Sequence, residues 1–333
     1  MTIKKRIAVT LPAGPNIQDT IERLKWAEEH GIPDAWFADA GAPDTLTQIA
    51  AVGHHTSTLR IGVAVTPVYT RSPSVIAASA NVISQVIPGR FVIGLGSSSQ
   101  TIMGGWNGIP LDKPLTRVKE TAQLVRAMLK GEKTNFQGET LSSRGYRQAP
   151  LENPPPIYLA ALRPNMIEMA AEHGDGVIFN LWPQGALPKM MEHVKIGAEK
   201  AGKNPADVEI VNRAMVLCTD DKERGRNMFR AAFGPYYATP VYNKFLAWAG
   251  YADAAKAITE GWAAKDREKT AGALTDEMID EIGIIGNEDE IRARIQEDAD
   301  GGIHTHIIAP LAETREDLER TFNAFTAENF SFK

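Results

Sequence analysis

The chain has 333 residues, of which 43% are hydrophobic and 23% charged, a single cysteine (Cys218) and a formal net charge of −5 at pH 7. This composition excludes a disordered chain, a strongly basic nucleic-acid-binding protein, an internal disulfide framework and a metal site built from several thiolates. No apolar run approaches the roughly 18 residues that span a bilayer, and no signal peptide is recognised, so we expect a cytoplasmic protein with no membrane partner.

Short β-branched runs alternate with longer segments of helical period along most of the chain. The predicted strands comprise residues 7–9, 35–38, 59–65, 91–95, 157–160, 177–179, 208–218 and 304–309. Helical sequence follows each strand, and the stretch after Pro114 has the 3.6-residue apolar spacing of an amphipathic helix. Near-continuous apolar strands need helices to cover them. Eight such units predict an α/β fold, a (β/α)8 TIM barrel, with a doubly wound open sheet as the alternative.

Two segments fit neither pattern, and we interpret them as insertions after the fourth and seventh strands. Residues 131–150 contain spaced glycines typical of a small hairpin, and residues 235–275 carry Tyr, Trp and Ala at helical spacing. Long insertions in a barrel usually elaborate its substrate side. No Pro/Gly/Ser-rich linker divides the chain, so residues 1–333 are expected to form a single domain.

The acidic stretch of residues 276–300 is predicted to hold a helix with a solvated charged face. The helix would begin at Asn287, because Glu290 three residues later completes a capping box. Its buried stripe would comprise Ile291, Ile295 and Ala299. The carboxylates are therefore not interpreted as a metal site.

Common catalytic motifs are missing from the sequence. Ser99 stands where a dinucleotide fingerprint would have its third glycine, and the sequence contains no phosphate-loop, nucleophile-elbow or His-Glu-x-x-His motif. His304 and His306 share one face of a strand, but no carboxylate signature accompanies them. We interpret them as barrel-interior or hydrogen-bonded histidines and predict no metal site.

Four strand ends carry the residues that suggest chemistry, because the active site of such a barrel lies where strands end. Asp39 follows the second strand, Thr66 the third, and three serines at residues 97–99 the fourth. Residues 160–165 follow the fifth strand and open a helix. Small residues and a helix N-terminus favour an anion there, and Arg163 adds a charged donor. These residues alone predict a barrel with a candidate phosphate site.

At these strand ends the sequence resembles the bacterial luciferase-like flavin and deazaflavin oxidoreductases. The blocks that match are residues 44–47, 50–51, 59–67, 70–73, 88–98, 154–161 and 170–176. The form Tyr-Leu-Ala-Ala-Leu-Arg-Pro at residues 158–164 is similar to the coenzyme F420 branch, which includes methylenetetrahydromethanopterin reductase and glucose-6-phosphate dehydrogenase relatives. The resemblance implies an F420-dependent oxidoreductase that transfers hydride between the deazaflavin and a small organic substrate, and a homodimer. An FMN-dependent monooxygenase and a non-catalytic flavin- or deazaflavin-binding protein are the alternatives.

The resemblance also implies roles for individual residues. Asp39 would bond the deazaflavin head group, and a non-prolyl cis peptide bond on either side of Ala64 would support the ring. The residues implied in cofactor binding are Asp39, Ala64, Val65, Thr66, Ser97, Ser98, Ala161, Leu162, Arg163, Asn165 and Met166, the last five at the phosphate end. Ser99, Trp106, Asn180 and Trp182 are predicted to line the substrate pocket, with hydrophobic packing as the alternative for both tryptophans.

Two positions depart from the sugar-phosphate dehydrogenase pattern of the family. Ala40 replaces a histidine after the second strand, and Ser99 replaces a glutamate after the fourth. Both are proton-transfer groups in that pattern, so oxidation of a sugar phosphate is not expected and no catalytic residue is assigned. An activated alkene, an imine or an electron-poor ring would suit a site with little proton transfer from the protein.

Overall fold

The barrel is closed by eight parallel strands in this computed structural model, which describes residues 3–11, 16–39, 41 and 43–333. The strands are β1 (Arg6–Leu11), β2 (Asp34–Phe37), β3 (Arg60–Val63), β5 (Phe91–Gly96), β8 (Ile157–Ala160), β9 (Gly176–Asn180), β10 (Glu209–Cys218) and β12 (Thr305–Pro310). Each strand pairs in parallel with the next, and the register Arg6↔Thr305 closes the ring between β1 and β12. The predicted TIM barrel is therefore confirmed, and the open sheet is excluded.

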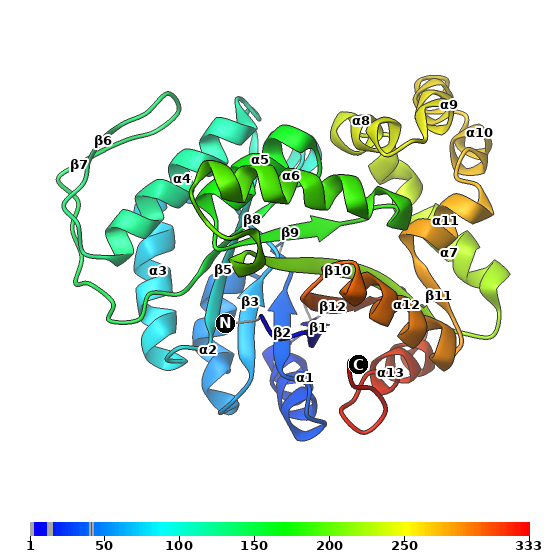
Figure 1. Cartoon of the computed structure of the whole chain (residues 1–333), viewed down its shortest axis with the longest axis horizontal. Helices are drawn as coiled ribbons and strands as arrows, with labels where there is room; N and C mark the ends of the chain where they lie inside the picture. The colour runs from blue at the N-terminus through cyan, green and yellow to red at the C-terminus, as the bar shows by residue number, and fades with distance from the viewer. Residues whose placement is uncertain (1–2, 12–15, 40, 42) are drawn as a thin grey trace.

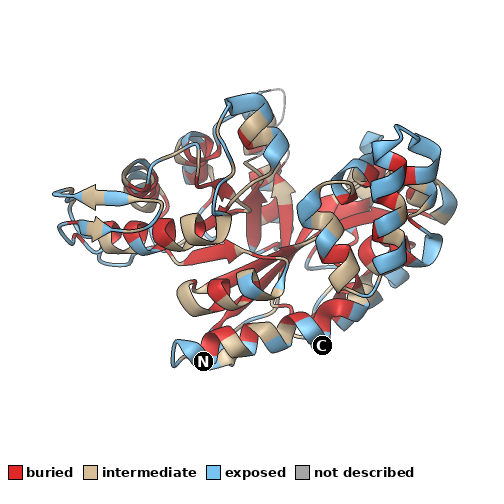
Figure 2. Cartoon of the chain, turned by 90° about the horizontal axis from the view of Figure 1, so that it is seen from above, coloured by how far each residue is buried: buried red, intermediate tan, exposed pale blue. Residues whose placement is uncertain are grey.

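Helices surround this barrel (Figure 1). They are α1 (Ile17–Glu29), α2 (Thr45–Val52), α3 (Pro73–Val86), α4 (Pro114–Leu129), α5 (Pro164–His173), α6 (Leu187–Lys200), α7 (Lys222–Tyr237), α8 (Pro240–Trp248), α9 (Ala252–Ala263), α10 (Arg267–Gly272), α11 (Asp276–Ile282), α12 (Glu288–Asp300) and α13 (Arg315–Asn323). Several begin at a residue whose side chain accepts a bond from the first turn, as Asp44 does from the N–H of Thr47. The strands are buried and the outer helix faces are exposed (Figure 2).

Two excursions leave the regular alternation of strand and helix. After the fourth barrel strand, β6 (Asn135–Gln137) and β7 (Ser142–Arg144) form an antiparallel hairpin that extends away from the barrel (Figure 1). Glu120 of α4 holds this hairpin, because its carboxylate accepts bonds from three consecutive backbone N–H groups at residues 139–141. After the seventh strand, α7 to α11 form a helical layer with its own apolar cluster, which includes Phe229 and Leu246.

The acidic stretch contains one element that the sequence did not predict. Strand β11 (Ile284–Gly286) pairs in parallel with β10 through the register Val216↔Ile284. The predicted capping box at Asn287 and Glu290 is confirmed, and α12 follows it. The stretch is thus two helices with a short strand between them.

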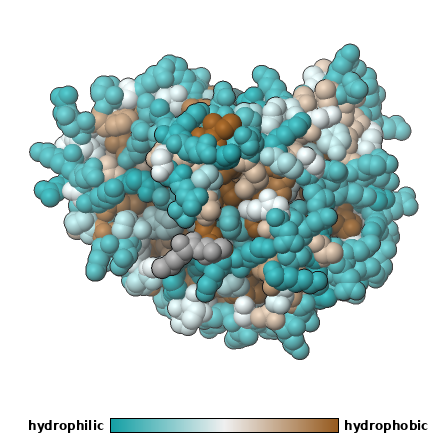
Figure 3. All heavy atoms as spheres, viewed as in Figure 1, coloured by the Kyte–Doolittle hydropathy of each residue, from teal (hydrophilic) through white to brown (hydrophobic). Residues whose placement is uncertain are grey.

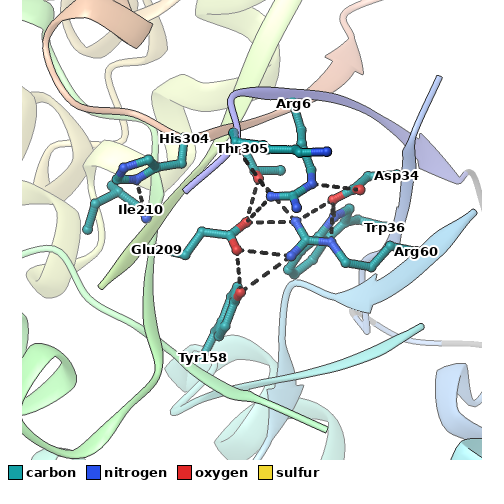
Figure 4. A network of polar contacts seen from close by, with 10 residues as sticks. Arg6, Asp34, Trp36, Arg60, Tyr158, Glu209, Ile210, His304 and Thr305 are labelled. Atoms are coloured by element: carbon teal, nitrogen blue, oxygen red, sulfur yellow. Dashed lines mark hydrogen bonds and ion pairs between the residues drawn. The ribbon is translucent and has the colours of Figure 1, made fainter. Parts of the chain in front are cut away.

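The amino-terminal end of the barrel is closed by a buried network of charges (Figure 4). Arg60, the first residue of β3, donates to Asp34 of β2 (Nε to Oδ2, 2.8 Å) and to Glu209 of β10 (Nη2 to Oε1, 2.7 Å). The hydroxyls of Thr305 and Tyr158 each donate to Glu209 over 2.6 Å. Burial opposes the ionisation of Glu209, but its bonds to Arg60 prevail and hold its pKa at about 2. This end of the barrel therefore serves stability.

His304 is hydrogen-bonded, as one of the two predicted alternatives states, whereas His306 lies outside the barrel interior and has no hydrogen-bond partner among the described residues. His304 accepts a bond at Nδ1 from the N–H of Ile210 (3.0 Å; Figure 4), and His306 is fully buried beside Phe332. The face of the molecule in Figure 3 is mostly hydrophilic, and its hydrophobic residues form separate patches. Within the described ranges, none of the helices combines the length and the apolar character needed to cross a membrane.

Candidate functional site

The carboxyl ends of the barrel strands enclose a cavity of about 730 Å³. The residues directly at the ends of β2, β3 and β5 are small, and larger side chains from α4, α5, α7 and α8 and from the strands β9 and β10 complete the lining. The lining comprises Ala38, Ala64, Val65, Gly96, Ser97, Ser98, Ser99, Ile102, Leu111, Pro114, Leu115, Ala160, Ala161, Leu162, Arg163, Pro164, Asn165, Met166, Ile178, Asn180, Arg213, Tyr236, Val241, Tyr242, Lys244 and Trp248. Most of the predicted cofactor residues therefore lie together in one cavity.

The surface over β3 and β5 is shaped by backbone that approaches closely. The peptide bond between Ala64 and Val65 is cis, which confirms the non-prolyl cis bond expected next to Ala64 and locates it on the carboxyl side. A Cβ on Gly96 would lie 2.4 Å from Cγ2 of Val65, so only glycine leaves Val65 in its place. Ser97 and Ser98 follow directly on the cavity lining. Residues 64–65 and 96–98 thus form a surface of small side chains on the cavity wall, which we call the seat and which suits a flat ring.

The entry to α5 presents donors to the same cavity. Pro164 is the first residue of α5 and lacks an N–H, and the backbone N–H groups of Leu162, Arg163 and Asn165 have no acceptor within the described residues. The guanidinium of Arg163 likewise bonds no carboxylate or carbonyl oxygen of the described chain, although it lines the cavity. Unpaired amides, a helix N-terminus and a cationic side chain together favour an anion such as phosphate.

Asp39 and Thr66 lie apart from this lining. Asp39 forms an ion pair with Arg71 (Oδ2 to Nη1, 2.7 Å), and Arg71 also binds Asp44. Burial raises the pKa of Asp39, and the positive charge of Arg71 opposes that rise. Thr66 is fully buried in β4 (Thr66–Pro67), which pairs with β5. Neither residue is part of the cavity lining, and their implied roles in cofactor binding stay predictions.

The tryptophans predicted for the substrate pocket have other surroundings. Trp106 ends a π-helical turn (Thr101–Trp106) and is 62% exposed. Trp182 is only 3% exposed, packs in the main core and donates its indole N–H to Oδ1 of Asn212 (2.9 Å). The hydrophobic-packing alternative thus describes Trp182. Ser99 and Asn180 do line the cavity, and the Ser99 hydroxyl also accepts a bond from the N–H of Ile102 (3.3 Å). Ala40 lies outside the described residues.

The sequence profile of the luciferase-like monooxygenase family matches residues 1–305. The chain belongs to this family. A 5,10-methylenetetrahydromethanopterin reductase of Methanolobus tindarius is 29% identical over 297 residues, which cover 88% of this chain and 90% of that protein. An F420-dependent glucose-6-phosphate dehydrogenase of Mycolicibacterium gilvum is 30% identical over 230 residues, 62% of this chain and 66% of that one. The solved structure of the coenzyme F420-dependent tetrahydromethanopterin reductase from Methanopyrus kandleri has the same fold, with a TM-score of 0.83, 18% identity and coverage of 98% of this chain and 100% of that chain.

The polar residues of this luciferase-like cavity that were not predicted include Arg213 and Tyr242. Arg213 of β10 is the register partner of Asn180 on β9, and Asn180 donates through Nδ2 to the hydroxyl oxygen of Tyr242 on α8 (2.9 Å). Burial lowers the pKa of Arg213 and raises that of Tyr242. An arginine followed by the apolar run of residues 214–218 in a buried strand was the available signal for Arg213. Tyr242 lies in the insertion of residues 235–275, whose helical spacing and expected place on the substrate side were the available signal, but neither singled out this tyrosine.

Proposed function

We propose that this protein is a coenzyme F420-dependent oxidoreductase that transfers hydride between the deazaflavin and a small organic substrate. The observation that carries the proposal is the donor set at the entry to α5, where the unpaired amides and Arg163 open onto the cavity. A relative named as a putative coenzyme F420-dependent oxidoreductase, which matches 84% of the chain at 25% identity, supports the same cofactor. A cofactor phosphate is the anion that a cavity of this family would place there.

The described residues fit such a cofactor at both of its ends. The amides of Leu162, Arg163 and Asn165 would hold the phosphate, while the seat over Gly96 and Val65 would support the ring. When bound, the deazaflavin supplies a hydride donor or acceptor. The chain itself binds and orients this group, and the walls of the cavity exclude water from it. The aromatic side chains of α7 and α8 also line the cavity, away from the residues assigned to the cofactor, and a substrate would bind against them. This room for a substrate favours an enzyme over a non-catalytic binding protein.

Cofactor choice and reaction type can be tested in one pair of measurements. The purified protein is titrated with F420 and, in parallel, with FMN. Reduced F420 is then offered with activated alkenes, imines and electron-poor rings. We expect F420 to bind more tightly and to be oxidised by at least one acceptor without consumption of oxygen. Turnover that requires FMN and takes up oxygen would establish the monooxygenase instead, and tight binding without any turnover would indicate a binding protein.

The phosphate site makes a separate prediction. Arg163→Glu places a negative charge beside the cofactor phosphate and should weaken F420 binding about tenfold or more. The loss should be larger at low salt, because fewer ions then screen the repulsion between the two negative charges. The dissociation constant is measured by fluorescence titration at two ionic strengths. Arg144→Glu makes the same charge change on the exposed hairpin strand β7 and should leave the affinity unchanged. Equal affinities for the Arg163→Glu variant and the unaltered protein would contradict the site.

Location and assembly complete the proposal. The composition and the single cysteine support action in the cytoplasm, where thiols remain reduced. The homodimer is proposed from the resemblance of the sequence to this family. Light scattering of the purified protein would give a mass of two chains.

A further inference from the structure

In the part of the chain that the structure describes, the guanidinium of Arg213 has no anionic or oxygen hydrogen-bond partner. Its Nε is enclosed and has no hydrogen-bond partner in the described part of the chain, and Nη1 lies 3.6 Å from the sulfur of Met215. Arg90 offers a comparison, because it also has no carboxylate partner. The guanidinium of Arg90, however, donates to the carbonyl oxygens of Gly53, Thr56 and Leu59. A buried donor without an acceptor is costly, so the unpaired Arg213 indicates a ligand group.

The surroundings of Arg213 favour an anion. None of the described residues that line the cavity is Asp or Glu, whereas Arg163, Arg213 and Lys244 all line it. Tyr242 accepts its bond from Asn180, and its own hydroxyl proton has no acceptor in the described chain. Burial raises the pKa of Tyr242, so this hydroxyl stays protonated and remains a donor. Two donors of different elements therefore face the cavity next to each other.

This second cationic position is separate from the phosphate site at α5. Arg163 follows β8 and Arg213 lies on β10, with β9 between these strands. The two guanidiniums therefore come from strands that are not neighbours, and a cofactor and a substrate in the same cavity can each supply one of them with an anion.

We propose that Arg213 and Tyr242 form a subsite for the carboxylate of an organic-acid substrate. The subsite rests on the proposed function, which assigns the cofactor phosphate to Arg163 and leaves Arg213 for a second anion. A guanidinium matches a planar carboxylate through parallel N–H bonds. Tyr236, Val241 and Trp248 line the adjacent wall and would pack against the apolar body of the acid. The substrate class is thus a small acid with an aromatic or aliphatic body.

Binding of neutral and charged probes of equal shape tests the subsite. Benzoate and cinnamate are compared with benzamide and cinnamamide by calorimetry, with the protein alone and with the protein saturated by F420. We expect each acid to bind the unaltered protein about tenfold or more tightly than its amide. Arg213→Gln should abolish that difference by weakening the acids about tenfold, while the amides change less than about twofold. Arg144→Gln removes a positive charge from the exposed hairpin strand β7, outside the cavity lining, and should leave the affinity for the acids unchanged.

Three results would overturn the subsite. In the first, no acid binds the unaltered protein more tightly than its amide, a comparison that does not depend on any variant folding. In the second, Arg213→Gln retains the affinity for the acids. In the third, Arg213→Gln weakens F420 as much as the acids, which would assign the arginine to the acidic groups of the cofactor. These experiments measure binding and not turnover, and they include the protein without F420. The acid and amide affinities therefore test the subsite even if the proposed F420 chemistry fails.

Discussion

Replacing Arg60 by methionine is expected to lower the free energy of unfolding by about 3–5 kcal/mol, because the buried carboxylates of Asp34 and Glu209 would keep, of their ion pairs, only the longer ones with Arg6, at 3.8 Å. Both acids are less than 10% exposed, and Arg60 is their shared donor at the amino-terminal end of the barrel (Figure 4). Methionine preserves much of the side-chain volume, so the loss reports the charge. Denaturant-induced unfolding at neutral pH measures it.

A second variant separates the loss of charge from a general disturbance of the barrel. Adding Glu209→Gln to the Arg60→Met chain removes one of the two buried carboxylates that lost their bonds to Arg60. It should therefore restore part of the lost stability. Lys113→Met breaks an ion pair with Glu139 whose two side chains are 57% and 55% exposed, and should have little effect. If Arg60→Met were as mild as Lys113→Met, the network would not stabilise the barrel.

The barrel could be predicted because its signal is local and repeated. Each apolar run that is followed by helical sequence indicates one strand–helix unit by itself. Eight such units in one chain are typical of a closed (β/α)8 barrel. Strand β11 escaped this reasoning because Ile284 and Ile285 are flanked on both sides by acidic helices, whose charges dominate the pattern. The Arg60 network escaped it for a different reason. Its members are far apart in the sequence, and only barrel closure brings them together.

In the cavity too, features formed by contiguous residues could be predicted, whereas features formed by residues far apart in the sequence could not. The α5 entry was predicted from contiguous residues, because small residues before a helix carry their meaning locally. Trp182 follows a strand end in the sequence, but the positive φ of Leu181 turns the chain there, and the indole packs on Asn212. Tyr242 reaches Asn180 only through the packing of the helical excursion against the barrel. Arg213 was recognisable as a charge in a buried strand, but its missing partner is visible only in three dimensions.

Gly94→Ala should cost at least about 3 kcal/mol of stability, because the added Cβ would lie 1.8 Å from the carbonyl oxygen of Val63. That oxygen belongs to the backbone of the neighbouring strand β3, so no side-chain rotation can relieve the overlap. Either β3 or β5 must move, and Ala64 and Val65 follow Val63 directly at the cavity. We therefore expect a lower unfolding midpoint together with weaker cofactor binding, measured on the soluble fraction by thermal unfolding and F420 titration.

Gly234→Ala is the matched control, since an added Cβ at Gly234 of α7 meets nothing within 4 Å. This substitution should keep the stability or raise it by up to about 1 kcal/mol, because alanine favours a helix interior over glycine. A Gly94→Ala protein that unfolds with the unaltered midpoint would show that β3 and β5 can separate without cost. The close approach of these two strands would then not be what fixes the seat at Val65, and the geometry of the cavity would have to depend on the helices outside the barrel.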